Sequence, residues 1–133
     1  MQIAIWSEEY ETGYPLVDQQ HKNLFDMINS YHTAINSDHE TNKISSILND
    51  LALYTQSHFR TEESLMVSSG YPDIAKHKQL HNNLISKVNE LINEFQTDKT
   101  LRSTQISAFL ADWLRHHIKK EDMLLIQWVR LHA

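Results

Sequence analysis

The stretch PDIAKHKQLHNNLISKVNELINEF, residues 72–95, decides the fold. Its apolar side chains and its two histidines recur at alternating intervals of three and four residues, which is the repeat of one face of an α-helix. Pro72 is typical of a helix start, and Gly70 of the end of a preceding helix. The stretch therefore predicts one long helix, whose buried face carries Ile74, His77, His81, Leu84, Val88, Leu91 and Phe95.

Three further segments carry the same repeat, at about residues 17–37, 41–67 and 103–128. Four helices of similar length with short polar connections predict an all-α protein, an up-down-up-down four-helix bundle. Residues 1–16 show no long periodicity, and we expect them to form an extended N-terminal arm that packs through its aromatic side chains. We therefore expect a single domain over residues 1–133, with the arm at 1–16 and the bundle at 17–128.

Composition excludes several classes of protein. The chain has 133 residues, a net charge of −5 and no basic run, which argues against nucleic acid or an anionic membrane surface as a partner. It has no cysteine, so any metal must bind nitrogen and oxygen ligands. No apolar run is long enough for a membrane span, and we expect a cytoplasmic protein. The sequence leaves the oligomeric state open and slightly favours a monomer, and the net charge argues neither for nor against self-association.

His77 and His81 lie four residues apart on the inward face of their helix, so their side chains point the same way. Burial of such polar groups costs a few kcal/mol each unless they find partners. Two readings stay open for the pair alone, namely two hydrogen-bonded core histidines or two metal ligands. His58 and Glu62 repeat the same spacing on the second helix, and other inward histidines are His21 and His117.

The register of the helices decides between these readings. In an antiparallel bundle, the starts of the first and third helices lie beside the ends of the second and fourth. The five histidines and Glu62 then fall within roughly 5–17 Å of one bundle end, at 1.5 Å rise per residue. This convergence indicates a metal centre. Five imidazoles with carboxylates exceed the needs of one zinc ion and suit two bridged octahedral ions, for which iron fits better than manganese or zinc.

A bridge between two ions needs a second carboxylate, which the fourth helix should supply. Glu121 follows His117 by four residues and lies on the ideal helical face, whereas Asp122 follows it by five and lies off that face. Spacing alone leaves both residues as candidates.

Four motifs carry a family resemblance: DQQHKNLF (18–25), HFRTEESLM (58–66), GYPDIAKHKQLH (70–81) and WLRHHIKKED (113–122). With them the sequence resembles the hemerythrin family, and in particular its single-domain bacterial members, over essentially the whole chain. The resemblance implies two non-haem iron ions joined by an oxo or hydroxo bridge.

The resemblance also implies a ligand set. One iron would take His77, His81 and His117, and the other would take His21 and His58 and keep one position open. Glu62 and Asp122 would bridge the two ions. The family thus favours Asp122 over Glu121, and we expect the fourth helix to distort locally so that Asp122 turns inward.

The implied function is reversible binding of dioxygen by a carrier, store or supplier that is not an enzyme, with an oxygen-consuming enzyme as a possible recipient. By the resemblance, Trp113, Leu114 and Ile118 would line an apolar dioxygen pocket. An enzyme, a di-iron oxidase or peroxidase, is the alternative; a sensor module is a third possibility. Carboxylate-rich di-iron bundles typically use four Glu and two His, whereas the histidine-rich set here favours reversible binding.

Three further polar residues have other expected roles. Asp18 is expected either to cap the first helix or to hydrogen-bond behind a ligand. Glu63 is expected on a solvated face, and His32 is expected as a hydrogen-bonded histidine of the core or the bundle end.

Overall fold

The structure is a computed structural model that describes residues 2–35, 41–97 and 103–132. The described residues form helices and no strand, which confirms the predicted all-α class. In chain order the elements are the 3₁₀ turn η1 (Glu8–Tyr10), α1 (Pro15–Ile35), α2 (Thr41–Ser69), α3 (Ile74–Thr97), α4 (Ser103–His117), the π-helical segment η2 (Ile118–Asp122) and α5 (Met123–Leu131).

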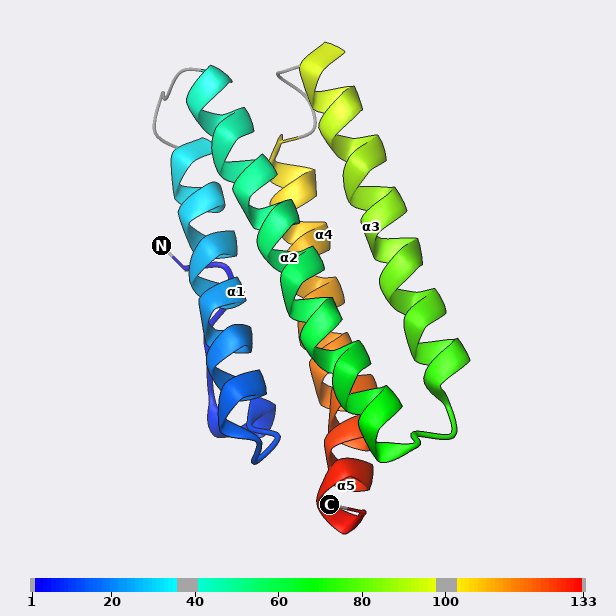
Figure 1. Ribbon diagram of the computed structural model, residues 1–133. Helices are drawn as coiled ribbons and strands as arrows, with labels where there is room; N and C mark the ends of the chain where they lie inside the picture. Colours follow the sequence, from blue (N-terminus) through cyan, green and yellow to red (C-terminus); the bar gives the residue numbers. More distant parts are fainter. Residues whose placement is uncertain (1, 36–40, 98–102, 133) are drawn as a thin grey trace.

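The helices run alternately up and down in a four-helix bundle, in which α4, η2 and α5 together make the fourth rod (Figure 1). The expected bundle is therefore confirmed, and the helix ends lie within about three residues of their predicted positions. The predicted polar connections near 37–42 and 96–100 lie largely outside the described residues. No helix among the described residues is long and apolar enough to cross a membrane.

The chain turns sharply between α2 and α3. Gly70 has φ of 65°, a left-handed conformation that glycine adopts without strain, and the Tyr71 N–H donates to the Met66 carbonyl at 2.9 Å. Gly70 thus ends α2, as expected. Pro72 does not begin α3; the helix begins at Ile74, and the His77 N–H donates to the Asp73 carbonyl at 3.0 Å.

The core consists of two apolar clusters separated by a polar layer. The larger includes Leu24, Phe59, Leu84 and Leu114, and the smaller comprises Val17, Met66, Tyr71, Leu125, Ile126 and Val129. Along each helix, the predicted ligands fall between residues of the smaller and the larger cluster. The polar layer is therefore closed off by apolar side chains on both sides.

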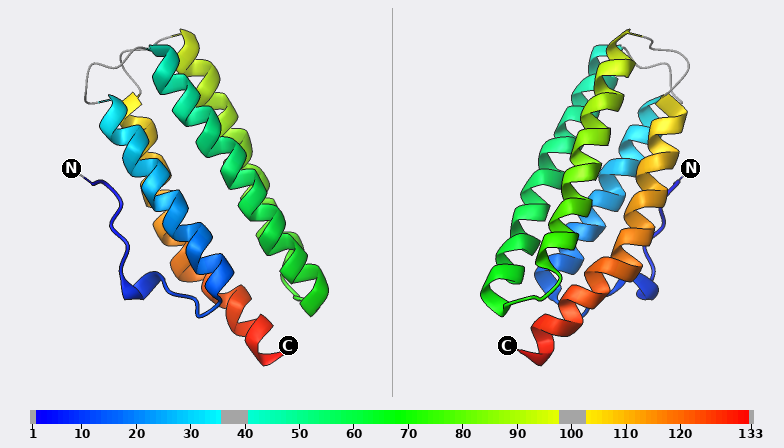
Figure 2. Two further views of the ribbon diagram at one scale, coloured as in Figure 1. Left: turned by 60° about the vertical axis from the view of Figure 1, so that its left-hand side comes forward. Right: turned by 90° about the vertical axis from the view of Figure 1, so that its right-hand side faces the viewer.

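The N-terminal arm lies along α1 and the fourth rod, on the side of the bundle away from α2 and α3 (Figure 2). The Asn29 side chain accepts from the Ile3 and Ala4 N–H groups at 2.9 and 2.8 Å and donates to the Ala4 carbonyl at 2.7 Å. Trp6 and Tyr10 pack against Phe25. The Asn29 amide and this aromatic cluster therefore both help to hold the arm.

Asp18 fastens the last part of the arm to α1. Its carboxylate accepts from the Thr12 N–H and hydroxyl at 2.8 and 2.7 Å, and from the Gly13 N–H at 3.1 Å. Asp18 therefore binds the segment that leads into α1.

Candidate metal centre

Seven polar side chains meet in the layer between the two apolar clusters. None of them is more than 5% exposed. Their potential ligand atoms form two overlapping groups, within each of which these atoms lie at most 4.8 Å apart. One group is Glu62, His77, His81, His117 and Asp122; the other is His21, His58, Glu62 and Asp122. The structure thus brings together all seven residues that the family resemblance implies as ligands.

The two oxygens of Glu62 face different histidines. Oε1 lies 3.1 Å from His81 Nε2 and 3.8 Å from His77 Nε2. Oε2 lies 3.3 Å from His58 Nε2 and 3.4 Å from His21 Nε2.

Asp122 divides its oxygens in the same way. Oδ1 lies 3.0 Å from His117 Nε2 and 3.1 Å from His77 Nε2, while Oδ2 lies 3.0 Å from His21 Nε2. Each carboxylate therefore turns one oxygen to a half of the centre with three histidines (His77, His81, His117) and the other to a half with two (His21, His58). We call these the three-histidine half and the two-histidine half.

The π-helical segment η2 explains how Asp122 reaches the cluster. A π turn holds one residue more than an α turn, so the residue five positions after His117 takes the place that the fourth would otherwise occupy. Glu121 is half-buried and lines an open groove with His116 and Lys120. Of the two carboxylates that spacing leaves open, the structure places Asp122 in the cluster.

Several atoms of the cluster have no hydrogen-bond partner among the described residues. They are both ring nitrogens of His21 and His77 and both oxygens of Glu62 and Asp122. A buried polar group without a partner costs about 1–3 kcal/mol, and a charged group more. The donors are imidazole and carboxylate, and bonds of about 2.1 Å to one ion at right angles would place neighbouring donors about 3 Å apart. The residues present therefore fit bound cations.

The histidines and carboxylates of the layer shift one another's pKa values. Burial disfavours the charged form of His21, but the carboxylates of Asp122 and Glu62 outweigh it and raise the pKa to about 9. His117 also has a raised pKa, because the carboxylates outweigh its burial. The pKa values of Glu62 and Asp122 are lowered, since the surrounding histidines outweigh burial. A bound cation would replace protons held here.

Two residues outside the cluster contact the imidazole rings of predicted ligands, and the sequence alone gives no sign of these contacts. Gln20 Oε1 lies 2.6 Å from His58 Nδ1, and Glu63 Oε2 lies 3.2 Å from His81 Nδ1. Glu63 is partly exposed, as expected for a solvated face, but its carboxylate also contacts His81. Both contacts join neighbouring helices, and periodicity within one helix gives no signal for them.

Aromatic rings pack on two of the predicted ligands. Phe59 stacks on His81, with ring centroids 3.6 Å apart, and Trp113 stacks on His117 at 4.3 Å. These rings fix the planes of the imidazoles and cover them with apolar surface.

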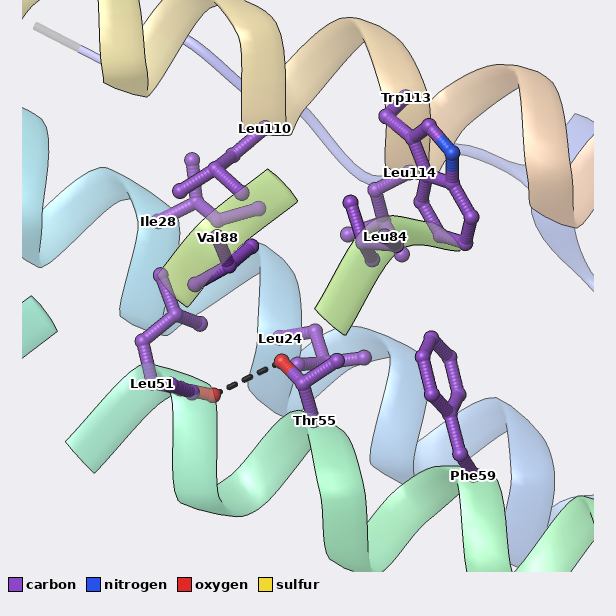
Figure 3. A pocket seen from close by; sticks show the side chains of 11 residues that line it. Leu24, Ile28, Leu51, Thr55, Phe59, Leu84, Val88, Leu110, Trp113 and Leu114 are labelled. Atoms are coloured by element: carbon purple, nitrogen blue, oxygen red, sulfur yellow. Dashed lines mark hydrogen bonds between the residues drawn. The ribbon is translucent and has the colours of Figure 1, made fainter. Parts of the chain in front are cut away.

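An apolar cavity lies one helical turn from the cluster, towards the larger apolar core (Figure 3). Its volume is about 30 Å³. Phe59 and Trp113 close one end, and the Thr55 hydroxyl is already used, because it donates to the Leu51 carbonyl at 2.8 Å. Trp113 and Leu114 line this cavity, while Ile118 is fully buried and is not among its lining residues.

His32 lies away from the cluster, near the other end of α1. Its Nδ1 is 2.9 Å from the buried Ser107 hydroxyl oxygen, which agrees with the expectation of a hydrogen-bonded histidine.

Comparisons with known proteins assign the chain to a family. The hemerythrin HHE cation-binding domain matches residues 12–129. The chain is 32% identical to a bacteriohemerythrin of Stenotrophomonas maltophilia, over 99% of this chain and 85% of that protein. It is 33% identical to a bacteriohemerythrin of Methylococcus capsulatus, over 93% of this chain and 95% of that protein.

A crystal structure of wild-type hemerythrin superposes with a TM-score of 0.88 at 31% identity, over 96% of this chain and 98% of that one. Family, relatives and structure thus point the same way as the buried cluster. The chain belongs to the hemerythrin family.

Proposed function

We propose that this chain binds dioxygen reversibly at a non-haem di-iron centre. One iron would be held by His77, His81 and His117, and the other by His21 and His58. Glu62 and Asp122 would bridge the two ions, together with a solvent-derived oxo or hydroxo group. The observation that carries this proposal is that each carboxylate turns a different oxygen to each half of the centre.

The unequal number of histidines assigns different tasks to the two halves. Three nitrogens and two carboxylate oxygens surround the three-histidine half, whereas two nitrogens and two carboxylate oxygens surround the other. The two-histidine half therefore has room for one more ligand. The two iron ions would supply the electrons for reversible binding of dioxygen there.

The apolar side chains around the centre exclude water and acids. Dioxygen is apolar and about as large as water, so the cavity of about 30 Å³ suits it, while an apolar cavity of this kind gives a water molecule few partners. Trp113 and Leu114 line the cavity, and the fully buried Ile118 would also keep water away from the centre. Exclusion of protons and water favours release of unchanged dioxygen over irreversible oxidation of the metal.

An oxidase or peroxidase is the competing function. Enzymes of the carboxylate-rich class present four Glu and two His in their bundle cores, whereas the cluster here presents five His and two carboxylates. Neutral imidazoles favour the ferrous state and reversible binding. The relatives named bacteriohemerythrin and hemerythrin also support the binding role.

The optical spectrum tests this proposal directly. Iron-loaded protein, reduced under anaerobic conditions, is exposed to dioxygen and then deoxygenated through several cycles. We expect a charge-transfer band that appears with dioxygen and disappears when it is removed. Immediate and irreversible conversion to the diferric form would favour the enzyme. We further propose that the chain works as a cytoplasmic monomer that supplies an oxygen-consuming enzyme.

A further inference from the structure

We propose that Gln20 and Glu63 are positioning residues of the metal centre, each of which holds one ligand histidine from the side opposite the metal. This inference rests on the proposed function, because it assigns roles toward the ions that the cluster would bind. It concerns the Nδ1 atoms of His58 and His81, which face away from the bridging carboxylates.

A chain of hydrogen bonds fixes the direction of the Gln20 contact. The Thr61 hydroxyl donates to the Ser57 carbonyl at 3.4 Å, so its oxygen accepts from Gln20 Nε2 at 3.3 Å. That contact turns Gln20 Oε1 toward His58 Nδ1, at 2.6 Å. An amide oxygen only accepts hydrogen bonds, so Nδ1 carries the proton and Nε2 keeps its lone pair free for a metal.

Glu63 fixes His81 in the same tautomer. An ionised carboxylate only accepts, so the His81 Nδ1–H donates to Glu63 Oε2 at 3.2 Å. Glu62 is the preceding residue of α2, and its Oε1 lies 3.1 Å from His81 Nε2. Two consecutive residues of α2 therefore touch opposite sides of one imidazole of α3.

The two contacts differ in charge. Gln20 is neutral and serves the two-histidine half, whereas Glu63 is anionic and serves the three-histidine half. A carboxylate behind an imidazole raises its basicity as a ligand, and loss of such a partner typically weakens metal binding about 10–100-fold. Glu63 is 26% exposed at its side chain, so solvent screens part of its charge. The three-histidine half should therefore bind its cation more tightly than the other.

Two substitutions of Glu63 separate the effect of its hydrogen bond to His81 from the effect of its negative charge. Glu63→Ala removes both the acceptor and the charge, whereas Glu63→Gln keeps an acceptor oxygen and removes the charge. The matched control is Glu90→Gln, because Glu90 is 57% exposed on α3 and contacts Lys87 rather than a ligand. Gln20→Ala provides the corresponding change in the other half.

The measurement is stepwise binding of Co²⁺ to metal-free protein, followed by the visible absorption of the bound ion and by competition with a chelator. We expect two binding steps in the unchanged protein. Glu63→Ala should weaken one step by about 10–100-fold and shift the cobalt spectrum, and Glu63→Gln should recover part of the loss. Gln20→Ala should weaken the other step, and Glu90→Gln should leave both within about twofold.

Each outcome has one meaning. If the unchanged protein binds no ion, the proposed function fails before the inference is reached. If it binds two ions and both Glu63 variants keep its affinities and spectrum, the inference is wrong. Equal weakening by Glu90→Gln would also overturn it, because the effect would then come from net charge. If Glu63→Ala unfolds, the nearly isosteric Glu63→Gln and Gln20→Ala carry the test.

Discussion

Asp122 Oδ1 lies 3.0 Å from His117 Nε2, although the two residues are five positions apart on one helical rod. In a regular α-helix, a residue five positions on would point away from the face that carries His117. The π-helical segment Ile118–Asp122 absorbs the extra residue, and α5 then continues to Leu131. One local distortion therefore brings the second carboxylate into the cluster.

Substitutions at neighbouring positions test this assignment. Asp122→Asn is expected to lower the iron content from two ions to one or none per chain, because an amide offers one acceptor oxygen in place of two. Glu121→Gln is expected to keep both ions, since Glu121 lines an outer groove. Iron and protein assays of the purified variants measure this. Loss of iron in Glu121→Gln alone would show that the bridge is assigned to the wrong residue.

The metal-free protein should lose stability at alkaline pH. His21 has a folded pKa of about 9 against an ordinary value of 6.5, so its contribution is fully present below pH 6.5 and is lost as the pH rises through about 9. A shift of this size corresponds to a few kcal/mol in the free energy of unfolding. Urea unfolding between pH 6 and 10 measures the loss.

The iron-loaded protein provides the control for this pH dependence. A cation takes the place of the proton on His21, so the alkaline loss should be smaller with iron bound. At acid pH, the lowered pKa values of Glu62 and Asp122 predict the opposite sign, namely loss of stability as the pH falls. A metal-free profile that is flat between pH 6 and 10 would contradict the charge assignment of the cluster.

Leu114 is expected to protect the centre from water. Leu114→Asn places a polar amide in the wall of the apolar cavity, where it gives a water molecule a partner. We expect oxidation to the diferric form to accelerate about tenfold, which corresponds to roughly 1.4 kcal/mol in the barrier. The decay of the dioxygen-dependent band measures this rate. Leu53→Asn is the control, because Leu53 is 64% exposed; equal acceleration in the control would rule out the protective role.

Asn29 is expected to stabilise the fold without any role at the metal. Asn29→Ala removes the clamp on Ile3 and Ala4 and leaves buried backbone groups without partners. The expected cost is about 2–6 kcal/mol, from roughly one to three kcal/mol for each of the two buried Ala4 groups left unpaired. Thermal unfolding measures it, with the exposed Asn82→Ala as the control. An Asn29→Ala protein as stable as this control would show that the arm is not held by the amide.

The bundle was readable from the sequence because each helix repeats its apolar positions every three or four residues. The same repeat placed His58, Glu62, His77 and His81 on inward faces, and the antiparallel register brought them to one level. Asp122 was different. Its side chain enters the cluster only through the π turn, and an ideal helical repeat favours Glu121. The resemblance to a known family, and then the structure, separated these two residues.

The contacts of Gln20 and Glu63 could not be predicted from the helical repeat. Gln20 and Glu63 lie beside proposed ligands in the sequence but contact imidazole rings on a different helix. Such contacts depend on the distance and rotation between helices, which the pattern within one helix does not contain. Asp18 is a different case, because its carboxylate binds the non-helical arm at Thr12 and Gly13, and the helical repeat does not describe the path of the arm.

The most direct test of a dinuclear centre is a crystal structure of the iron-loaded protein with anomalous diffraction at the iron edge. We predict two anomalous peaks per chain between Glu62 and Asp122, one beside His77, His81 and His117 and the other beside His21 and His58. Each carboxylate should contact both peaks. A single peak, or an iron bound by Glu121 in place of Asp122, would contradict the proposed centre.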